Sequence, residues 1–324
     1  MFRRSKQSRT RLFFATDVHG SEQCFRKFVN AAEVYEVSAL VLGGDVTGKV
    51  MVPLVANGDG AWHAELYGEP ITARGVEELG ALRKRIRTMG RYDVVLTPEE
   101  KGEVDADPTR IDGLFRAAMR ASLERWVALA EERLGPTGIP CYMMLGNDDF
   151  DELAEALRGS DVVTYAEDGV FELPGGFELA SIGYSTPTPW HTPRELPEQE
   201  LGDRIDALLA QVREPEQAVF NFHCPPRDTH LDQSPLLDGE LRPVVDASGV
   251  RMHSVGSSAV RRAIEDTRPL LGLHGHVHES PAGQKLGPTM CVNPGSDYGD
   301  GILRGAIVDL DRDKGVRRWQ IVQG

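Results

Sequence analysis

The sequence predicts an α/β fold in which buried strands alternate with amphipathic helices. Short apolar segments of strand length recur from residue 12 onward, and stretches with a helical spacing of apolar residues separate them. Each of the first five apolar segments also ends in Gly, Asp, Asn or His. Open α/β sheets bind their ligands at the carboxyl ends of the strands. The pattern therefore predicts both the fold class and the edge at which a site would lie.

The expected elements follow one another along the chain. The first five strands occupy residues 11–17, 38–45, 139–148, 217–226 and 268–278. Later strands, at shorter spacing and more antiparallel in character, occupy residues 288–296, 305–311 and 318–322. Helices are expected at residues 21–35, 148–159, 198–213 and 257–267. We therefore expect a single domain over residues 1–324, organised around a central sheet.

One region interrupts this alternation. Residues 48–138 separate two core strands, and this connection is far longer than usual. It contains a hairpin pattern with a Gly-rich turn at residues 51–68 and helix-like stretches at residues 75–90 and 110–135. We therefore expect an insertion at about residues 48–138 that forms a cap or lid.

The composition is that of a soluble globular protein. The chain is 40% hydrophobic and has a net charge of −14, so it offers no overall attraction to nucleic acid phosphates. No apolar run has the length of a membrane span, and no apolar stretch of secretory length precedes Asp17. The 4 cysteines are scattered, without the spacing of a zinc or redox motif. A cytoplasmic protein is expected, with no membrane partner and no strong nucleic-acid binding.

Side chains that can bind metal collect at the ends of the expected strands. They are Asp17, His19, Asp45, Asn147, His223, His276 and His278. Alternate residues of an extended chain point to the same side, so residues 17 and 19, and residues 276 and 278, can each reach one place. Imidazoles and carboxylates gathered this densely would repel one another and lose hydration unless a cation lay among them. Their number exceeds the needs of one ion and fits two ions about 3.5–4 Å apart that share a carboxylate.

These motifs resemble the calcineurin-like metallophosphoesterase superfamily. The segments DVH, GGD, GNDD, NFHCPP and HGHVH stand in the family's order and span the chain outside the insertion. The segments around HGHVH and NPGS are similar to a bacterial and archaeal cytosolic branch. The resemblance implies a four-layer αββα sandwich with a dinuclear centre. It implies the following ligands: Asp17, His19 and His278 for a first metal ion, Asn147, His223 and His276 for a second, and Asp45 as the bridge.

One position departs from the family pattern. Well-known members have a histidine after Gly-Asn that contacts the substrate phosphate, whereas this sequence has Asp148. An ionised carboxylate would repel a phosphate. Asp148, the candidate catalytic residue, could therefore be protonated, could hydrogen-bond to a neighbour, or could take no part in the chemistry. Asp149 matches an acidic position that supports the ligands from behind, and His274 is expected to support or to pack. Arg227 is a candidate contact for the substrate phosphate.

Two alternative interpretations compete with this one. The segment GGDVTGKV satisfies most of a nucleotide-binding P-loop, with Lys49 at the position of the motif's lysine. Val50 follows where the motif requires a hydroxyl group, and Pro53 lies where it requires a helix, so a P-loop is disfavoured. The second alternative is a catalytically weak family member that acts as a metal- or nucleotide-binding scaffold. Such proteins usually lose ligands, whereas none of the expected ligands is missing here.

The sequence thus predicts a metal-dependent phosphoesterase that acts on a phosphodiester or a phosphomonoester, with the diester favoured. In the expected reaction, a metal-bound hydroxide at the dinuclear centre attacks the phosphorus atom without a covalent enzyme intermediate. The expected cofactors are two divalent ions, Mn²⁺ first, with Fe, Zn, Ni and Mg as alternatives. The expected partner is a small phosphoester or nucleotide-like substrate, which the insertion would help to select.

Overall fold

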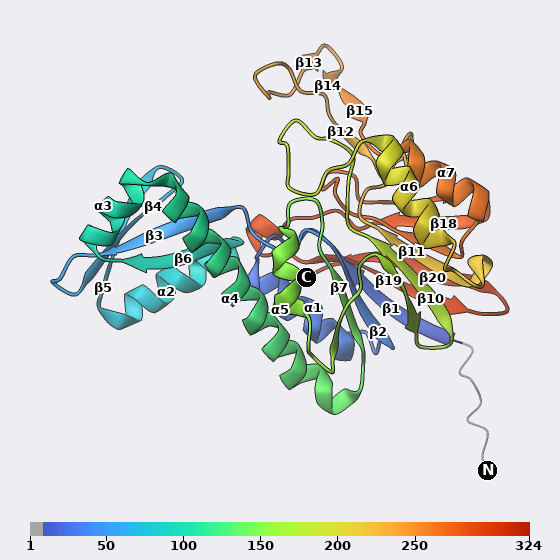
Figure 1. Ribbon diagram of the computed structural model, residues 1–324, viewed down its shortest axis with the longest axis horizontal. Helices are drawn as coiled ribbons and strands as arrows, with labels where there is room; N and C mark the ends of the chain where they lie inside the picture. Colours follow the sequence, from blue (N-terminus) through green and yellow to red (C-terminus); the bar gives the residue numbers. More distant parts are fainter. Residues whose placement is uncertain (1–8) are drawn as a thin grey trace.

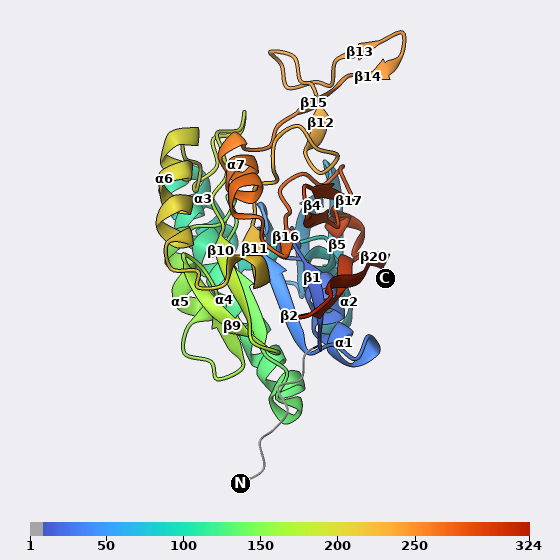
Figure 2. The ribbon, with the colours of Figure 1, turned by 90° about the vertical axis from the view of Figure 1, so that its right-hand side faces the viewer.

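The structure, a computed structural model, describes residues 9–324 (Figure 1). Two six-stranded β-sheets lie at its centre. Helices α6 and α7 lie on one side of the sheets and α1 lies on the other (Figure 2). The α/β class and the four-layer αββα arrangement are therefore confirmed. The expectation of one central sheet was wrong, because the pattern of strands along the chain does not reveal that they divide between two sheets.

The first sheet has the strand order β20–β19–β1–β2–β7–β8. Its strands are β1 (Arg9–Ala15), β2 (Ala39–Gly43), β7 (Cys141–Met144), β8 (Val163–Tyr165), β19 (Arg304–Asp311) and β20 (Gly315–Gln323). Strands β1, β2, β7 and β8 are parallel, and β19 runs antiparallel to β1. Side chains alternate between the faces of β1, so Phe13 packs with the helices while Leu12 and Phe14 pack toward the second sheet.

The second sheet has the order β17–β18–β16–β11–β10–β9. Its strands are β9 (Gly169–Leu173), β10 (Phe177–Ile182), β11 (Ala218–Phe222), β16 (Leu271–Leu273), β17 (Ala282–Leu286) and β18 (Thr289–Asn293). Strands β10, β11, β16 and β18 are parallel. Val219 packs between the sheets, whereas Phe220 and Phe222 pack with α6 and α7. Alternation along the strands thus fills the inner layer and one outer layer with apolar side chains.

The helices cover the outer faces through apolar stripes. Their bounds are Glu22–Val34 (α1), Pro108–Leu134 (α4) and Ala154–Leu157 (α5) over the first sheet, and Glu198–Leu209 (α6) and Ser258–Thr267 (α7) over the second. Trp126 of α4 stacks on Phe25 of α1, with ring centroids 4.3 Å apart. Helix α4 is therefore fixed to the core by its C-terminal half. Within residues 9–324, no helix is both long and apolar enough to cross a membrane.

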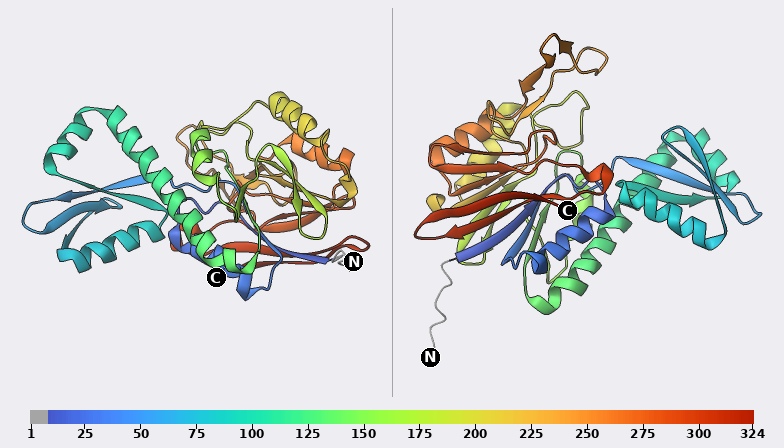
Figure 3. Two further views of the ribbon diagram at one scale, coloured as in Figure 1. Left: turned by 60° about the horizontal axis from the view of Figure 1, so that its bottom comes forward. Right: turned by 180° about the vertical axis from the view of Figure 1, so that it is seen from behind.

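The region between β2 and β7 contains a separate small sheet that projects from the core (Figure 3). Its strands, in the order β5–β4–β3–β6, are β3 (Val50–Ala56), β4 (Ala61–Leu66), β5 (Glu69–Arg74) and β6 (Arg91–Leu96). Helices α2 (Gly75–Thr88) and α3 (Pro98–Ala106) accompany it. Strands β3 and β4 pair antiparallel at the expected hairpin. The C-terminal half of α4 lies in the helix layer of the core, so only part of residues 48–138 stands apart from the sandwich.

Short elements complete the loops around the sheets. The long loop before α7 contains two small pairs, β12 (Gln233–Pro235) with β15 (Met252–Ser254) and β13 (Val245–Asp246) with β14 (Gly249–Val250). Single 3₁₀ turns lie at Gly135–Thr137, Asp151–Leu153, Pro215–Gln217 and Tyr298–Asp300. The carboxyl ends of β1, β2 and β7 from the first sheet and of β11 and β16 from the second lead into one group of buried loops. The candidate site lies there.

Candidate metal centre

The loops at this edge have an unusual backbone conformation. Four of the predicted ligands have positive φ angles: Asp17 (53°), His19 (38°), Asp45 (49°) and His276 (67°). Residues other than glycine seldom adopt this region, and the strain persists only where the surrounding structure enforces it. Its concentration after three strands, β1, β2 and β16, indicates that the loops are shaped to aim side chains at a common point.

Two glycines allow these loops to approach each other. A Cβ atom on Gly146 would lie 2.1 Å from Oδ1 of Asp45, and one on Gly275 would lie 2.5 Å from Oδ2 of Asp17. Neither contact is sterically possible. Glycine at these positions therefore lets the backbone of one loop pack directly against a carboxylate of another.

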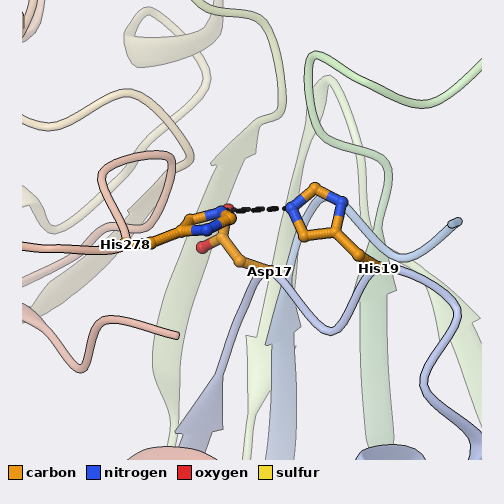
Figure 4. Close-up of side chains that lie close together, drawn as sticks. All are labelled: Asp17, His19 and His278. Carbon is orange, nitrogen blue, oxygen red and sulfur yellow. Dashed lines mark hydrogen bonds and ion pairs between the residues drawn. The ribbon is translucent and has the colours of Figure 1, made fainter. Parts of the chain in front are cut away.

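Asp17, His19 and His278 form one half of the cluster, called here the β1 half (Figure 4). Nε2 of His278 lies 3.3 Å from Oδ1 of Asp17, and Nε2 of His19 lies 3.1 Å from Nε2 of His278. Asp17 and His19 are buried. Among the described residues, Nδ1 of His19 has no hydrogen-bond partner. Two imidazoles that face each other beside a carboxylate, with a buried nitrogen left unpartnered, are costly in the absence of a cation.

Asn147, His223 and His276 form the other half, called here the β11 half. Oδ1 of Asn147 lies 3.1 Å from Nε2 of His223 and 2.6 Å from Nδ1 of His276. Nδ1 of His223 lies 2.8 Å from the carbonyl oxygen of Gly43, to which it donates a hydrogen bond. Thr192 accepts a hydrogen bond of 2.8 Å from Nδ2 of Asn147. Two of the three side chains of this half, His223 and Asn147, are thus oriented by neutral partners.

Asp45 lies between the halves. Its Oδ2 is 3.6 Å from Nε2 of His19, and its Oδ1 is 3.4 Å from Nε2 of His223. One carboxylate oxygen therefore faces each half, which is the arrangement required of a carboxylate shared by two ions. All seven predicted ligands lie in one network of contacts.

Burial and charge shift the pKa values of the cluster strongly. Burial lowers the pKa of His19 to about 3 and that of His276 to about 4. Burial would also lower the pKa of His223, but the carboxylate of Asp45 raises it to about 10. Burial alone would raise the pKa of Asp17, but His278 and His223 lower it to about 2. Without metal, protonated histidines therefore balance the buried carboxylates, in the place that a cation can take.

The donor set fits divalent cations. Three groups have ligand atoms within 4.8 Å of one another: Asp17, His19 and His278; Asp17, Asp45 and His223; and His19, Asp45 and Asp148. Imidazole nitrogens with carboxylate and amide oxygens suit Mn, Fe, Zn and Ni. Several separations of 3.3–4.0 Å between carboxylate oxygens and imidazole nitrogens exceed hydrogen-bond length and leave room for an ion between them.

Asp149 joins the loops that carry the predicted ligands. Its carboxylate accepts hydrogen bonds from the backbone nitrogens of Val46 (3.0 Å), Thr47 (2.8 Å) and Gly146 (2.7 Å). It thus ties the loop of Asp45 to the loop of Asn147. His274 is fully buried, and its Nδ1 lies 2.9 Å from the carbonyl oxygen of Phe222. Among the described residues, His274 is absent from the groups that could hold an ion.

Asp148 does not stand alone at the site. Its carboxylate forms an ion pair with Nζ of Lys49, and its backbone nitrogen donates a 2.9 Å hydrogen bond to Oδ1 of Asp45. Burial and the charge of Asp45 raise the pKa of Asp148 to about 7, while Lys49 opposes this shift. Of the three alternatives for Asp148, contact with a neighbour is the one visible in the structure.

Lys49 was missed as a site residue because the sequence analysis considered it only as part of a P-loop. Strand β3 follows it, not a helix.

Four members of the cluster, Asp45, Asn147, His276 and His278, line a cleft of about 1190 Å³. Phe115 and Met119 of α4 line one wall, and the proline-rich segment 186–193 lines another. Trp190 in this segment is 62% exposed. Arg227 lies in the wall, without an ion pair to a side chain of the described residues. The part of the inserted sheet that the structure describes does not line the cleft.

Sequence reasoning missed three further residues at the cleft. Tyr298 packs on His19, with ring centroids 4.6 Å apart. Thr192 orients Asn147, and Trp190 stands in the same loop. The repeated prolines of TPTPWHTP signal a stiff loop but do not reveal which strand end it contacts.

Comparison with solved structures agrees with the fold described above. No family model matches the chain. The chain shares its fold with a protein of Thermus thermophilus, TT1561, at 15% identity and a TM-score of 0.53, over 97% of this chain and 98% of that one. A 5'-nucleotidase precursor from the same organism has a TM-score of only 0.41 at 11% identity, over 97% of this chain and 54% of that one, which is too low to bear on function.

A relative by sequence is the uncharacterized protein MJ1162 of Methanocaldococcus jannaschii. It is 32% identical over 118 residues, which make up 36% of this chain. The match spans 47% of MJ1162, about half the length of that relative.

Proposed function

We propose that this protein is a metal-dependent hydrolase of phosphoester bonds. The observation that carries the proposal is the buried network of seven side chains from two sheets, of which four side chains line the cleft. The network combines carboxylates, imidazoles and an amide in positions that leave room for cations. A metal centre also accounts for the strained backbone of four of these residues at the same edge.

The β1 half and the β11 half would each hold one divalent ion, Mn²⁺ first, and Asp45 would contact both. When bound, such ions supply positive charge for a phosphoryl group and lower the pKa of water that can attack it. This local charge is needed because the chain as a whole has a net charge of −14.

The chain's own residues prepare the site. Asp149 holds the loops of Asp45 and Asn147 together, so that the ligands need little rearrangement. The walls around Phe115 and Trp190 would offer apolar contacts to the substrate. Asp148 and Lys49 form an ion pair that lines the cleft and would stand beside the phosphoryl group of a bound substrate.

A small phosphoester or a nucleotide-like molecule fits this cleft better than a nucleic acid. Of the described residues that line it, Lys49 and Arg227 are the only lysine and arginine, and Glu198 and Glu279 add negative charge. A polyanion would find few cationic partners there. A phosphodiester is favoured over a monoester because it brings less negative charge to Asp148. The cytoplasmic location stays a prediction from the sequence.

The test is to measure hydrolysis of bis(p-nitrophenyl) phosphate and p-nitrophenyl phosphate together with the metal content of the purified protein. We expect turnover that Mn²⁺ stimulates and chelation abolishes, with faster hydrolysis of the diester. Bound metal with no turnover of any phosphoester in a broad panel would support the alternative, a metal- or nucleotide-binding scaffold. Absence of stoichiometric metal binding would contradict the metal centre itself.

A further inference from the structure

Lys49 begins the chain segment that leaves the metal centre for the inserted sheet. It stands four residues after Asp45 and directly before β3. The backbone around it is tightly fixed. The nitrogen of Gly48 donates a 2.8 Å hydrogen bond to the hydroxyl of Tyr92, and Thr47 is bound by Asp149. A Cβ atom at position 48 would collide with the carbonyl oxygen of Gly90. The side chain of Lys49 therefore starts from a defined point beside the cluster.

The side chain of Lys49 turns toward the cleft. It is 48% exposed, lines the cleft and pairs with the largely buried carboxylate of Asp148. The backbone nitrogen of Asp148 donates a hydrogen bond to Asp45, and Oδ2 of Asp148 lies 3.9 Å from Nδ1 of His19. The ammonium group is thus oriented by a residue that touches the candidate metal centre, while one side remains open to a ligand.

The charges around the cleft give this ammonium group a distinct role. Arg227, the other Lys or Arg among the described lining residues, forms no ion pair or hydrogen bond with a predicted ligand. Of the two, Lys49 is therefore the cation that pairs with a residue at the cluster, and it offsets a carboxylate that would otherwise repel phosphate. A lysine ammonium group has three donors, and a pair with Asp148 leaves donors available.

We propose that Lys49 is a catalytic residue, with Asp148 as its positioning residue, for the hydrolysis proposed above, on which this inference rests. Nζ of Lys49 binds the phosphoryl group at the oxygen that links it to the leaving group. As a water oxygen bonds to phosphorus, the bond from phosphorus to the leaving oxygen breaks. Lys49 stabilises the negative charge on the departing oxygen, which takes up the proton released by the attacking water.

A purely structural ion pair is the competing explanation, and it predicts different results. A half-exposed pair contributes little to stability and has no reason to affect phosphate binding or the response to the leaving group. The matched control is Lys101→Met, since Lys101 forms a pair with Asp105 on α3, away from the cleft.

The experiment compares Lys49→Met, Lys49→Arg and Lys101→Met with the wild-type protein loaded with Mn²⁺. Calorimetry measures the affinity for inorganic phosphate, and kinetics measure aryl methyl phosphates whose leaving phenols differ in pKa. For Lys49→Met we expect about tenfold weaker phosphate binding and a kcat loss of about 10²-fold that grows with the pKa of the leaving phenol. Lys49→Arg should retain part of the phosphate affinity and part of kcat, because arginine keeps the positive charge. Metal content and thermal unfolding should match the wild type.

Equal phosphate affinity in Lys49→Met and Lys101→Met, or a kcat loss independent of the leaving group, would overturn the proposal. The calorimetric measurement also separates this failure from a failure of the proposed function. If the wild type hydrolysed no ester but lost phosphate affinity on Lys49→Met, the phosphate contact of Lys49 would stand and the hydrolase would not.

Discussion

The β1 half and the β11 half of the candidate metal centre differ in how their side chains are held. In the β11 half, His223 is fixed by Gly43 and Asn147 by Thr192. In the β1 half, Nδ1 of His19 lacks a partner among the described residues, and His278 is partly exposed to the cleft. Orientation by neighbouring hydrogen bonds lowers the cost of binding an ion. The β11 half should therefore hold its ion more tightly, and the ion of the β1 half should exchange more easily.

The largest effect is expected from Asp45→Asn, which removes the charge common to both halves. Asparagine tolerates the positive φ at this position, so the fold should be retained. Metal content should fall for both ions, and hydrolysis should fall on the order of 10³-fold. Elemental analysis and the diesterase assay check this, with Asp59→Asn in the exposed hairpin turn as the control. Normal turnover with normal metal content would refute the shared role of Asp45.

The next largest effect separates the halves. His223→Ala should lower the affinity of the β11 half for its ion by about 10²-fold. His278→Ala should lower only the affinity of the β1 half for its ion, by about tenfold. Calorimetric titration of the metal-free variants with Mn²⁺ measures both sites. If His278→Ala affected the tighter site instead, the ranking of the two halves would be reversed.

The halves should resemble each other in their dependence on pH. Without metal, Asp45 raises the pKa of His223 to about 10 despite its burial, and Asp17 raises that of His278. An ion must displace a proton from each, since only neutral imidazole binds metal. Affinity should therefore fall as the pH falls, by up to about tenfold per pH unit for each site. Titration in buffers of different ionisation enthalpy should show proton release at both sites, and release of no proton would contradict the charge balance.

The smallest effect is expected from Thr192→Val. The hydroxyl of Thr192 accepts the hydrogen bond from Nδ2 of Asn147, which directs Oδ1 of the amide toward the two histidines. Loss of this partner should lower the affinity of the β11 half for its ion by about tenfold or less and leave the affinity of the β1 half unchanged. The same Mn²⁺ titration measures it. An equal loss in both halves would show that Thr192 acts on the whole cleft and not on Asn147.

The sequence predicted the members of the cluster because each lies within five residues of the end of a buried strand. Strand ends are local features. The expected extended alternation at residues 17 and 19 was wrong, because both residues lie beyond the end of β1 and have positive φ angles, so the loop conformation brings them together. The division into two sheets was not visible in this way, because Phe13 and Phe220 are equally apolar whether they face a helix or a second sheet. Only the resemblance to a known family supplied it.

Contacts between distant loops could not be predicted. Thr192 reaches Asn147, and Lys49 reaches Asp148, through loop paths that no periodic pattern encodes. The strand β5 was also missed, since its sequence EPITAR has few apolar residues and it lies at the edge of the inserted sheet. The sharing of α4 between the insertion and the core depends on the stacking of Trp126 on Phe25, a tertiary contact.

The most direct test of the metal centre is anomalous X-ray diffraction from crystals of the Mn²⁺-loaded protein. The account predicts two peaks about 3.5–4 Å apart, one within the β1 half and one within the β11 half, with the Asp45 carboxylate between them. An absence of peaks at this edge under saturating Mn²⁺, or ions bound only elsewhere on the surface, would contradict it.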